Sequence, residues 1–255
     1  GATPPCYGAE PAVAEGLATW EDVQSWHSGE NDGLWSSLYL ASQAYRYAAT
    51  KDPVALAALK LLLEGEVTRM RITGVPGLFT RQFIPPNVPG IACPSDDAHY
   101  TTDVEKDDNR WVQIRDDGCA WVIPHETGVW TKTDHCGLDE YGGWCFLDNV
   151  SMDEYSGHMF ALAVIGKLID DEEIQATVTD LVAQVADHLI ENDLTLVDWD
   201  GRITEHGRIY ATSFTDPPGF NATVALLYMR MAHEMTGRAE YKAFFDDCLL
   251  QRSGT

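Results

Sequence analysis

Three clusters of acidic or amide side chains each stand directly before an apolar stretch with helical spacing. They occupy residues 29–35, 149–158 and 215–221. Side chains of these types at a helix start either cap the helix or remain available to bind a ligand. In stacked helical hairpins the first helix of every hairpin begins on the same rim, so we expect the three clusters to converge on one face.

Paired carboxylates on such a rim are suited to cleaving a glycosidic bond. One acts as the acid and the other as base or nucleophile, and their separation decides inversion or retention. We predict Asp32 or Glu30 from the first cluster and Asp153 from the second. Glu154 and His158 are four residues apart on one helix face, which makes them a further candidate pair for proton transfer.

The same clusters also have a structural interpretation. Ser151 and Glu154 have the spacing of a capping box, which would leave Asp153 freer to face a ligand. One of residues 30–32 is expected to cap the first helix. All three cannot cap, so at least one is available for a ligand.

Aromatic and basic residues flank these clusters. Aromatic rings stack on the apolar faces of pyranoses. Arginine binds carboxylates in a bidentate way, so basic rim residues in so acidic a chain indicate an anionic sugar such as a uronate. The candidates for substrate binding are Trp26, His27, Trp35, Arg81, His206, Arg208, Tyr210 and Asn221. Trp35 in the helical core, and arginines in salt bridges, are the structural alternatives.

The net charge of −23, from 40 acidic and 17 basic residues, restricts the partners. Nucleic acids and anionic membranes both require lysine and arginine. No window of 18 uncharged apolar residues predicts a membrane span. We expect no cofactor, although the acidic runs at 95–97 and 103–109 are candidates for Ca²⁺ without the EF-hand spacing.

Six cysteines indicate the compartment. Four of them lie between residues 93 and 145, and we predict at least one disulfide bond there. Disulfides favour an extracellular or periplasmic protein, and the first residues have no signal-peptide features, so any leader is expected to have been removed. Six reduced cysteines in a cytosolic protein are the alternative.

Apolar periodicity predicts six helices in three hairpins. Their expected ranges are 34–50 and 55–72, 153–169 and 173–191, and 219–236 and 240–250. Between the first two hairpins, residues 75–150 are rich in Gly, Pro, Trp and Cys and predict a disulfide-tied irregular or β insertion over the rim, with strands near 111–114 and 120–123. A β-hairpin is expected within 194–215. The prediction is one mainly α domain, 1–255.

Several motifs resemble bacterial (α/α) toroid proteins of the six-hairpin glycosidase-like superfamily. Residues 31–35 are similar to the first helix of that family, and residues 151–158 to a later helix start. Residues 72–77 with Arg81, 200–202 and 206–208 resemble its connections. The resemblance covers most of residues 29–250. It implies a toroid shared by glycoside hydrolases, polysaccharide lyases and sugar epimerases, without transferring a catalytic assignment.

The chain departs from that family in supplying three hairpins where a full toroid has about six. Either sequence outside this chain completes the ring, or the hairpins form an open arc. An open arc exposes an apolar flank, which favours a protein partner or a missing half.

Three functions follow as expectations. The first is a secreted carbohydrate-active protein that cleaves glycosidic bonds. The second is a non-catalytic extracellular module for glycan binding or assembly. The third is a uronate lyase or epimerase, with Arg81 or Arg208 neutralising the uronate and a base drawn from Tyr155, His158 or His206 with Tyr210.

Overall fold

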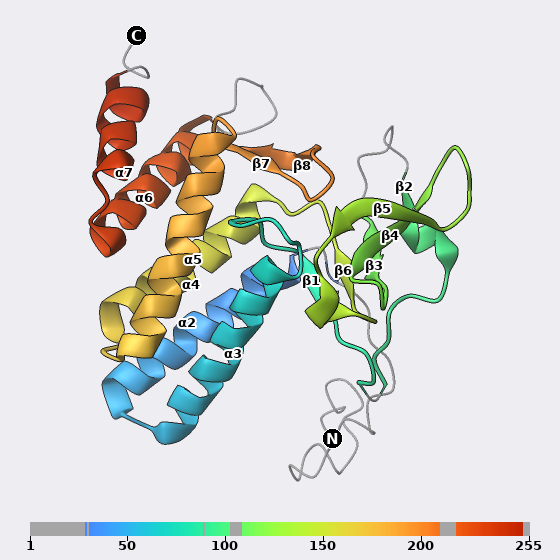
Figure 1. Ribbon diagram of the computed structural model, residues 1–255. Coiled ribbons are helices and arrows are strands. Elements are labelled where there is room, and N and C mark those ends of the chain that lie inside the picture. The colour runs from blue at the N-terminus through green and yellow to red at the C-terminus, as the bar shows by residue number, and fades with distance from the viewer. Residues whose placement is uncertain (1–28, 30, 89, 103–108, 210–217, 252–255) are drawn as a thin grey trace, which may run out of the picture.

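The computed structural model describes residues 29, 31–88, 90–102, 109–209 and 218–251 (Figure 1). Trp26, His27, Glu30 and Tyr210, all predicted site residues, lie outside these ranges. Their predicted roles stay predictions.

Six α-helices of the described part follow one another as three hairpins, which confirms that part of the prediction (Figure 1). They are α2 (Asp32–Thr50) with α3 (Pro53–Arg71), α4 (Met152–Leu168) with α5 (Glu172–Glu191), and α6 (Pro218–Thr236) with α7 (Ala239–Ala243), which continues into the π-helical η5 (Phe244–Leu250). The arrangement of the hairpins as a toroid stays a prediction.

Local chemistry sets the hairpin turns. Lys51 adopts the left-handed conformation at the end of α2. Asp52 then caps α3 by accepting from the Val54 amide at 2.9 Å, and Pro53 occupies the first helical position, where its missing N–H costs nothing. In the second hairpin Asp171 caps α5 by accepting from the Ile174 amide.

The insertion is a six-stranded sheet, so the chain is a mixed α and β protein rather than a mainly α one. Its strands are β1 (Gln82–Ile84), β2 (Thr101–Thr102), β3 (Trp111–Ile114), β4 (Cys119–Pro124), β5 (Thr131–Cys136) and β6 (Cys145–Leu147), with the short helices η3 (Asp97–Tyr100) and η4 (Asp139–Tyr141) between them. The order is β1-β6-β3-β4-β2, with β5 also paired to β4. Only the β2–β4 pair is parallel among these strands.

Two disulfides tie the sheet, which confirms the predicted bridge. Cys93 bonds to Cys145, and Cys119 bonds to Cys136 across β4 and β5. Cys248 has no disulfide partner among the described residues. Closing a long connection covalently restricts its unfolded ensemble, so the bridges stabilise a segment that has little helix to support it.

Side chains of the sheet alternate between two cores. Val112 and Phe146 join the large core formed with the helices. Their neighbours Trp111, Cys145 and Leu147 pack into a smaller cluster on the other face. The period of two in a strand therefore fixes one face of the sheet against the helices.

A second, two-stranded sheet follows α5. It consists of β7 (Thr195–Val197) and β8 (Ile203–Arg208), which confirms the hairpin expected in this connection. Figure 1 shows this hairpin extending from the end of α5 toward the six-stranded sheet. Its turn thereby meets the end of β6.

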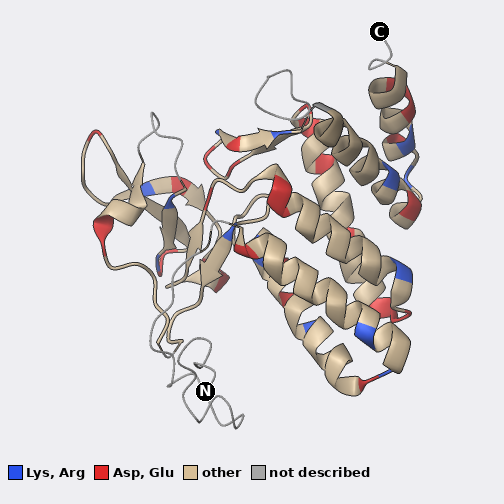
Figure 2. Cartoon of the chain, turned by 180° about the vertical axis from the view of Figure 1, so that it is seen from behind, with Lys and Arg blue, Asp and Glu red and all other residues tan. Residues whose placement is uncertain are grey.

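Acidic residues occupy mainly helix ends and loops, as Figure 2 shows in red. The bodies of the helices carry few charges in this view. None of the helices in the described ranges is both long and apolar enough to span a membrane.

Glycines bring the starts of α2 and α4 together. A Cβ at Gly157 would lie 2.7 Å from the Leu34 Cα, and one at Gly33 would lie 2.8 Å from the His158 Nε2 atom. No side chain fits at either position without moving backbone or a buried ring. The first two acidic clusters therefore share one rim, as predicted; part of the third lies outside the described residues.

We predict that Gly157→Ala destabilises the protein by about 1–3 kcal/mol, because the added methyl overpacks a helix contact made by backbone. Gly65→Ala is the matched control. It lies within α3 with nothing near the added Cβ, so it should stabilise by roughly 0.5–1 kcal/mol. Thermal unfolding measures both, and equal effects would contradict the close approach.

Candidate functional site

Two predicted carboxylates lie at the rim made by α2 and α4. Asp153 is exposed and accepts a hydrogen bond from the Asn31 side-chain amide at 2.9 Å. The oxygen of the same amide accepts from the Arg81 Nη1 atom at 3.0 Å. Asp32, half-buried at the start of α2, accepts from the Gln82 amide on β1. Both carboxylates are thus held in place rather than free at a flexible surface.

An ion pair lies directly beneath them. Arg81 contacts the fully buried Glu154 at 3.0 Å between Nη1 and Oε2. The other Glu154 oxygen accepts from the Gly33 amide at 3.2 Å, which joins α4 to the first turn of α2. Burial raises the pKa of Glu154, and the nearby Arg81 opposes that rise.

Two predictions fail here. Arg81 is only 4% exposed, so its expected position as a rim residue is wrong and the salt-bridge alternative is confirmed. The capping box is also wrong, because Ser151 makes no side-chain capping bond. Glu154 binds the backbone of a different helix instead, which supplies the partners that a buried charge needs.

A third layer of polar side chains lies below the rim carboxylates and the Arg81–Glu154 ion pair. It joins Ser37 of α2, Glu66 of α3 and His158 of α4. The His158 Nδ1 atom is 2.5 Å from Glu66 Oε2 and 2.9 Å from the Ser37 hydroxyl, and the Phe79 ring stacks on the imidazole. Burial alone raises the pKa of Glu66, but His158 and Arg69 more than offset it, so this pKa lies below its ordinary value. Glu154 and His158 share a helix face as predicted, yet both are buried beneath the rim rather than open to a substrate.

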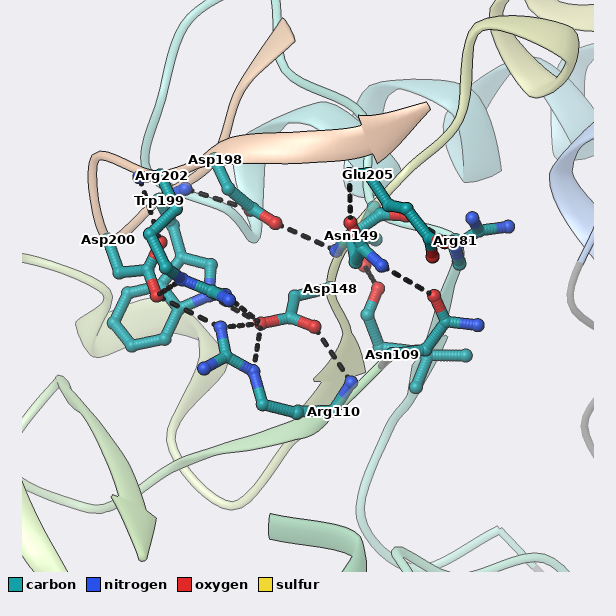
Figure 3. Close-up of polar contacts among 12 residues, drawn as sticks. Arg81, Asn109, Arg110, Asp148, Asn149, Asp198, Trp199, Asp200, Arg202 and Glu205 are labelled. Carbon is teal, nitrogen blue, oxygen red and sulfur yellow. Dashed lines mark hydrogen bonds and ion pairs between the residues drawn. The ribbon is translucent and has the colours of Figure 1, made fainter. Parts of the chain in front are cut away.

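Asn149 connects this stack of layers to the β7–β8 hairpin (Figure 3). Its carbonyl accepts from Arg81 Nε at 2.6 Å, and its amide N–H donates to Asp198 at 2.7 Å. Its side chain accepts from the Glu205 amide and donates to Asn109. Asn149 has a φ of 60°, a conformation that asparagine tolerates better than most residues.

Asp148 and Asp200, an acid of the hairpin turn, both contact Arg110 (Figure 3). Arg110 donates from its backbone and guanidinium to Asp148, at 2.8 and 2.7 Å, and from Nη2 to Asp200 at 2.9 Å. Arg202 also pairs with Asp200, at 2.6 Å. The contacts hold the hairpin turn against the end of β6.

Sequence reasoning missed this cluster. It treated residues 198–201 as a hairpin turn and residues 200–202 as a family-like connection, and it assigned nothing to Asp148 or Arg110. A usable signal was the pair Asp148-Asn149 directly after the apolar run 145–147, since polar residues at the end of a buried strand need partners.

Burial dominates the acid chemistry of this cluster. It raises the pKa of Asp198 to about 8, and the charge of Asp148 adds to the rise. Burial also raises the pKa of Asp148 to about 6, against the lowering effect of Arg110. One proton is therefore retained by this pair at a pH where ordinary carboxyls have lost theirs.

We predict that stability falls as pH rises from about 4 to about 8. In this window the folded protein keeps the Asp198 proton while the unfolded chain has released it. Each rise of one pH unit therefore lowers the free energy of unfolding by up to about 1.4 kcal/mol for this proton. Asp198→Asn should flatten the fall. Urea unfolding at pH 5 and pH 8 measures it, with Asp170→Asn, an exposed acid after α4, as the control. An unchanged pH difference in Asp198→Asn would contradict the assignment.

The remaining predicted residues lie apart from the buried layers. Trp35 is 64% exposed on α2, so its alternative placement in the core is wrong. His206 and Arg208 are exposed on β8, with His206 3.8 Å from Glu205. Asn221 is 1% exposed and donates to the Arg208 carbonyl at 3.3 Å, so it holds β8 rather than facing solvent.

The Ca²⁺ candidates gain no support from the described residues. Asp96 caps η3, and Asp97 accepts from the Trp130 indole. Within the described ranges no three His, Cys, Asp or Glu side chains are grouped so as to hold a metal. Residues 103–108, most of the second acidic run, lie outside them.

Comparisons with known proteins found no match among family models, curated proteins or solved structures. The resemblance to the six-hairpin glycosidase-like superfamily therefore rests on the sequence motifs. The roles of individual residues rest on the geometry above.

Proposed function

We propose that this chain is a secreted carbohydrate-active protein that cleaves glycosidic bonds with Asp32 and Asp153. The observation that supports it is the Asn31 side chain, which joins the exposed Asp153 to the buried Arg81. Through that bridge an ion pair of the interior orients a surface carboxylate. Pre-oriented carboxylates are what general acid–base and nucleophilic chemistry at a sugar requires.

The two carboxylates come from adjacent helix starts. Asp32 and Asp153 lie in the first turns of α2 and α4, which the glycines at 33 and 157 allow to approach closely. One then serves as base or nucleophile once the other holds the proton.

Aromatic residues follow Asp32 along α2. Trp35 is one turn further and Tyr39 one turn beyond that, and both are exposed. Residues at this spacing lie on one face of a helix. They offer ring faces for stacking sugars next to the acidic rim.

The lyase or epimerase alternative is less well supported. Tyr155 is fully buried, donates to the Gly77 carbonyl at 2.6 Å and accepts from the Phe79 amide. His158 is equally buried and bonded to Glu66. Neither is placed to take a proton from a bound sugar, and Arg81 is already neutralised by Glu154. Of the described lyase candidates only His206 and Arg208 are exposed.

An oxidising compartment fits this proposal. Two disulfides in the insertion are typical of proteins outside the cytosol. We therefore propose an extracellular or periplasmic location, where polysaccharide is the available substrate. A protein partner or a further chain segment that completes a toroid remains part of the proposal.

We predict that Asp153→Asn and Asp32→Asn each lower turnover by at least about 100-fold while the fold is kept, because each removes a group that exchanges protons or attacks the sugar. A polysaccharide panel scored for new reducing ends measures the loss, and the melting temperature checks the fold. Asp170→Asn, an exposed acid beyond the other end of α4, should retain full activity.

The same panel distinguishes the rival functions. New reducing ends accompanied by ultraviolet absorbance of an unsaturated uronate would replace the hydrolase with a lyase. No cleavage of any neutral or anionic polysaccharide by the unmodified protein would contradict the proposal and favour a binding module. Unfolding of Asp153→Asn would show that the cluster is structural.

A further inference from the structure

A second group of aromatic residues surrounds one arginine on the six-stranded sheet. The Arg115 Cζ atom, just after β3, lies 4.0 Å from the ring centre of Trp121 on β4 and 4.7 Å from that of Trp130. The Tyr100 ring of η3 packs against the Trp130 ring, and the two ring centres are 4.7 Å apart. Arg115 and both tryptophans are partly exposed.

Hydrogen bonds fix each member of this group. The Trp121 indole donates to Asp117 at 3.3 Å, and the Trp130 indole donates to Asp97 at 3.2 Å. Arg115 donates from Nε to the Gln113 side chain at 3.1 Å. Neither Nη atom of Arg115 has a hydrogen-bond partner among the residues that the structure describes. The hydrogen bond from Nε thus orients the guanidinium, and the two Nη groups are left to bind a ligand.

The nearby acids do not neutralise Arg115. Asp117 is engaged by Trp121 and by Lys132, whose Nζ atom is 3.0 Å from it. Asp97 is engaged by Trp130. A planar guanidinium with two unpaired Nη groups matches the two oxygens of a carboxylate, and the neighbouring indole rings match the apolar face of a pyranose.

This group is separate from the rim. Gln82 on β1 contacts Asp32, whereas Trp121 is on β4, three strands further along the sheet order. At ordinary strand spacing the two places are about 14 Å apart across the sheet. A long polymer could occupy both, but a single sugar could not.

We propose that Arg115 and Trp121 form a non-catalytic binding subsite for the uronate residues of an acidic polysaccharide. The uronate carboxylate accepts from the two Nη groups of Arg115, and the sugar ring packs beside the Trp121 indole, one face of which Arg115 already covers. The choice of a glycan as ligand rests on the proposed function. The subsite itself needs no bond cleavage, and it gives a strongly acidic chain a local cation for an acidic polymer.

Affinity electrophoresis and calorimetry with polygalacturonate and alginate test this subsite, each polymer being compared with its carboxyl-esterified form. The background is Asp153→Asn, so that cleavage does not interfere. We expect the Asp153→Asn protein to bind at least one of the two acidic polymers and not to bind the esterified form of that polymer. Adding Arg115→Ala should weaken binding by at least about tenfold, since a charged bidentate contact is lost. Arg115→Lys keeps the charge without the fork and should also weaken it.

Arg46→Ala is the matched control, because Arg46 is an exposed arginine paired with Asp52 at the turn after α2. It should bind like the background protein.

Undiminished binding by Arg115→Ala, equal binding of esterified polymer, or no binding of either acidic polymer would each overturn the subsite. A lower melting temperature with unchanged binding would assign Arg115 a purely structural role. Cleavage by the unmodified protein is scored separately, so failure at the rim and failure at the sheet are distinguishable.

Discussion

The buried ion pair between Arg81 and Glu154 is the interaction on which the rest of the structure depends. Arg81 contacts three segments that are distant in sequence: Asn31 before α2, Glu154 in α4, and the Asn149 carbonyl after β6. A charge in the interior must be fully paired, so these three segments can bury it only by coming together. The pair therefore fixes where two helices start and where the sheet ends.

Depth divides the carboxylates into two kinds. Three in the interior, Glu66, Glu154 and Asp148, have arginine or histidine partners, whereas the buried Asp198 accepts from backbone amides. Asp32 and Asp153 bond instead to neutral amides nearer the surface. A neutral amide orients a carboxylate without placing an opposite charge beside it, whereas arginine and histidine partners supply the charge that a buried carboxylate needs.

Much of the fold followed from sequence periodicity, whereas the site followed only in part. Helical spacing and the Asp52-Pro53 restart located the hairpins because those signals are local. The burial of Arg81 and the cluster around Arg110 depend on pairing between segments 38 to 90 residues apart, which one sequence does not show. Trp35 was ambiguous for the same reason: an aromatic residue on a helix can face a core or solvent, and only the packing of neighbours decides.

Asn149 has a consequence for how this protein can be made. Residues 149–151 read Asn-Val-Ser, an acceptor sequence for N-linked glycan, and residues 221–223 read Asn-Ala-Thr. Both asparagines are buried, and the side-chain nitrogens that would carry the sugar donate to Asn109 and to the Arg208 carbonyl. Glycosylation acts on the chain before it folds, so a eukaryotic secretory host that modifies Asn149 would place an oligosaccharide inside the junction of helices and sheet. Correct folding of this chain therefore favours a cell that exports proteins without that modification.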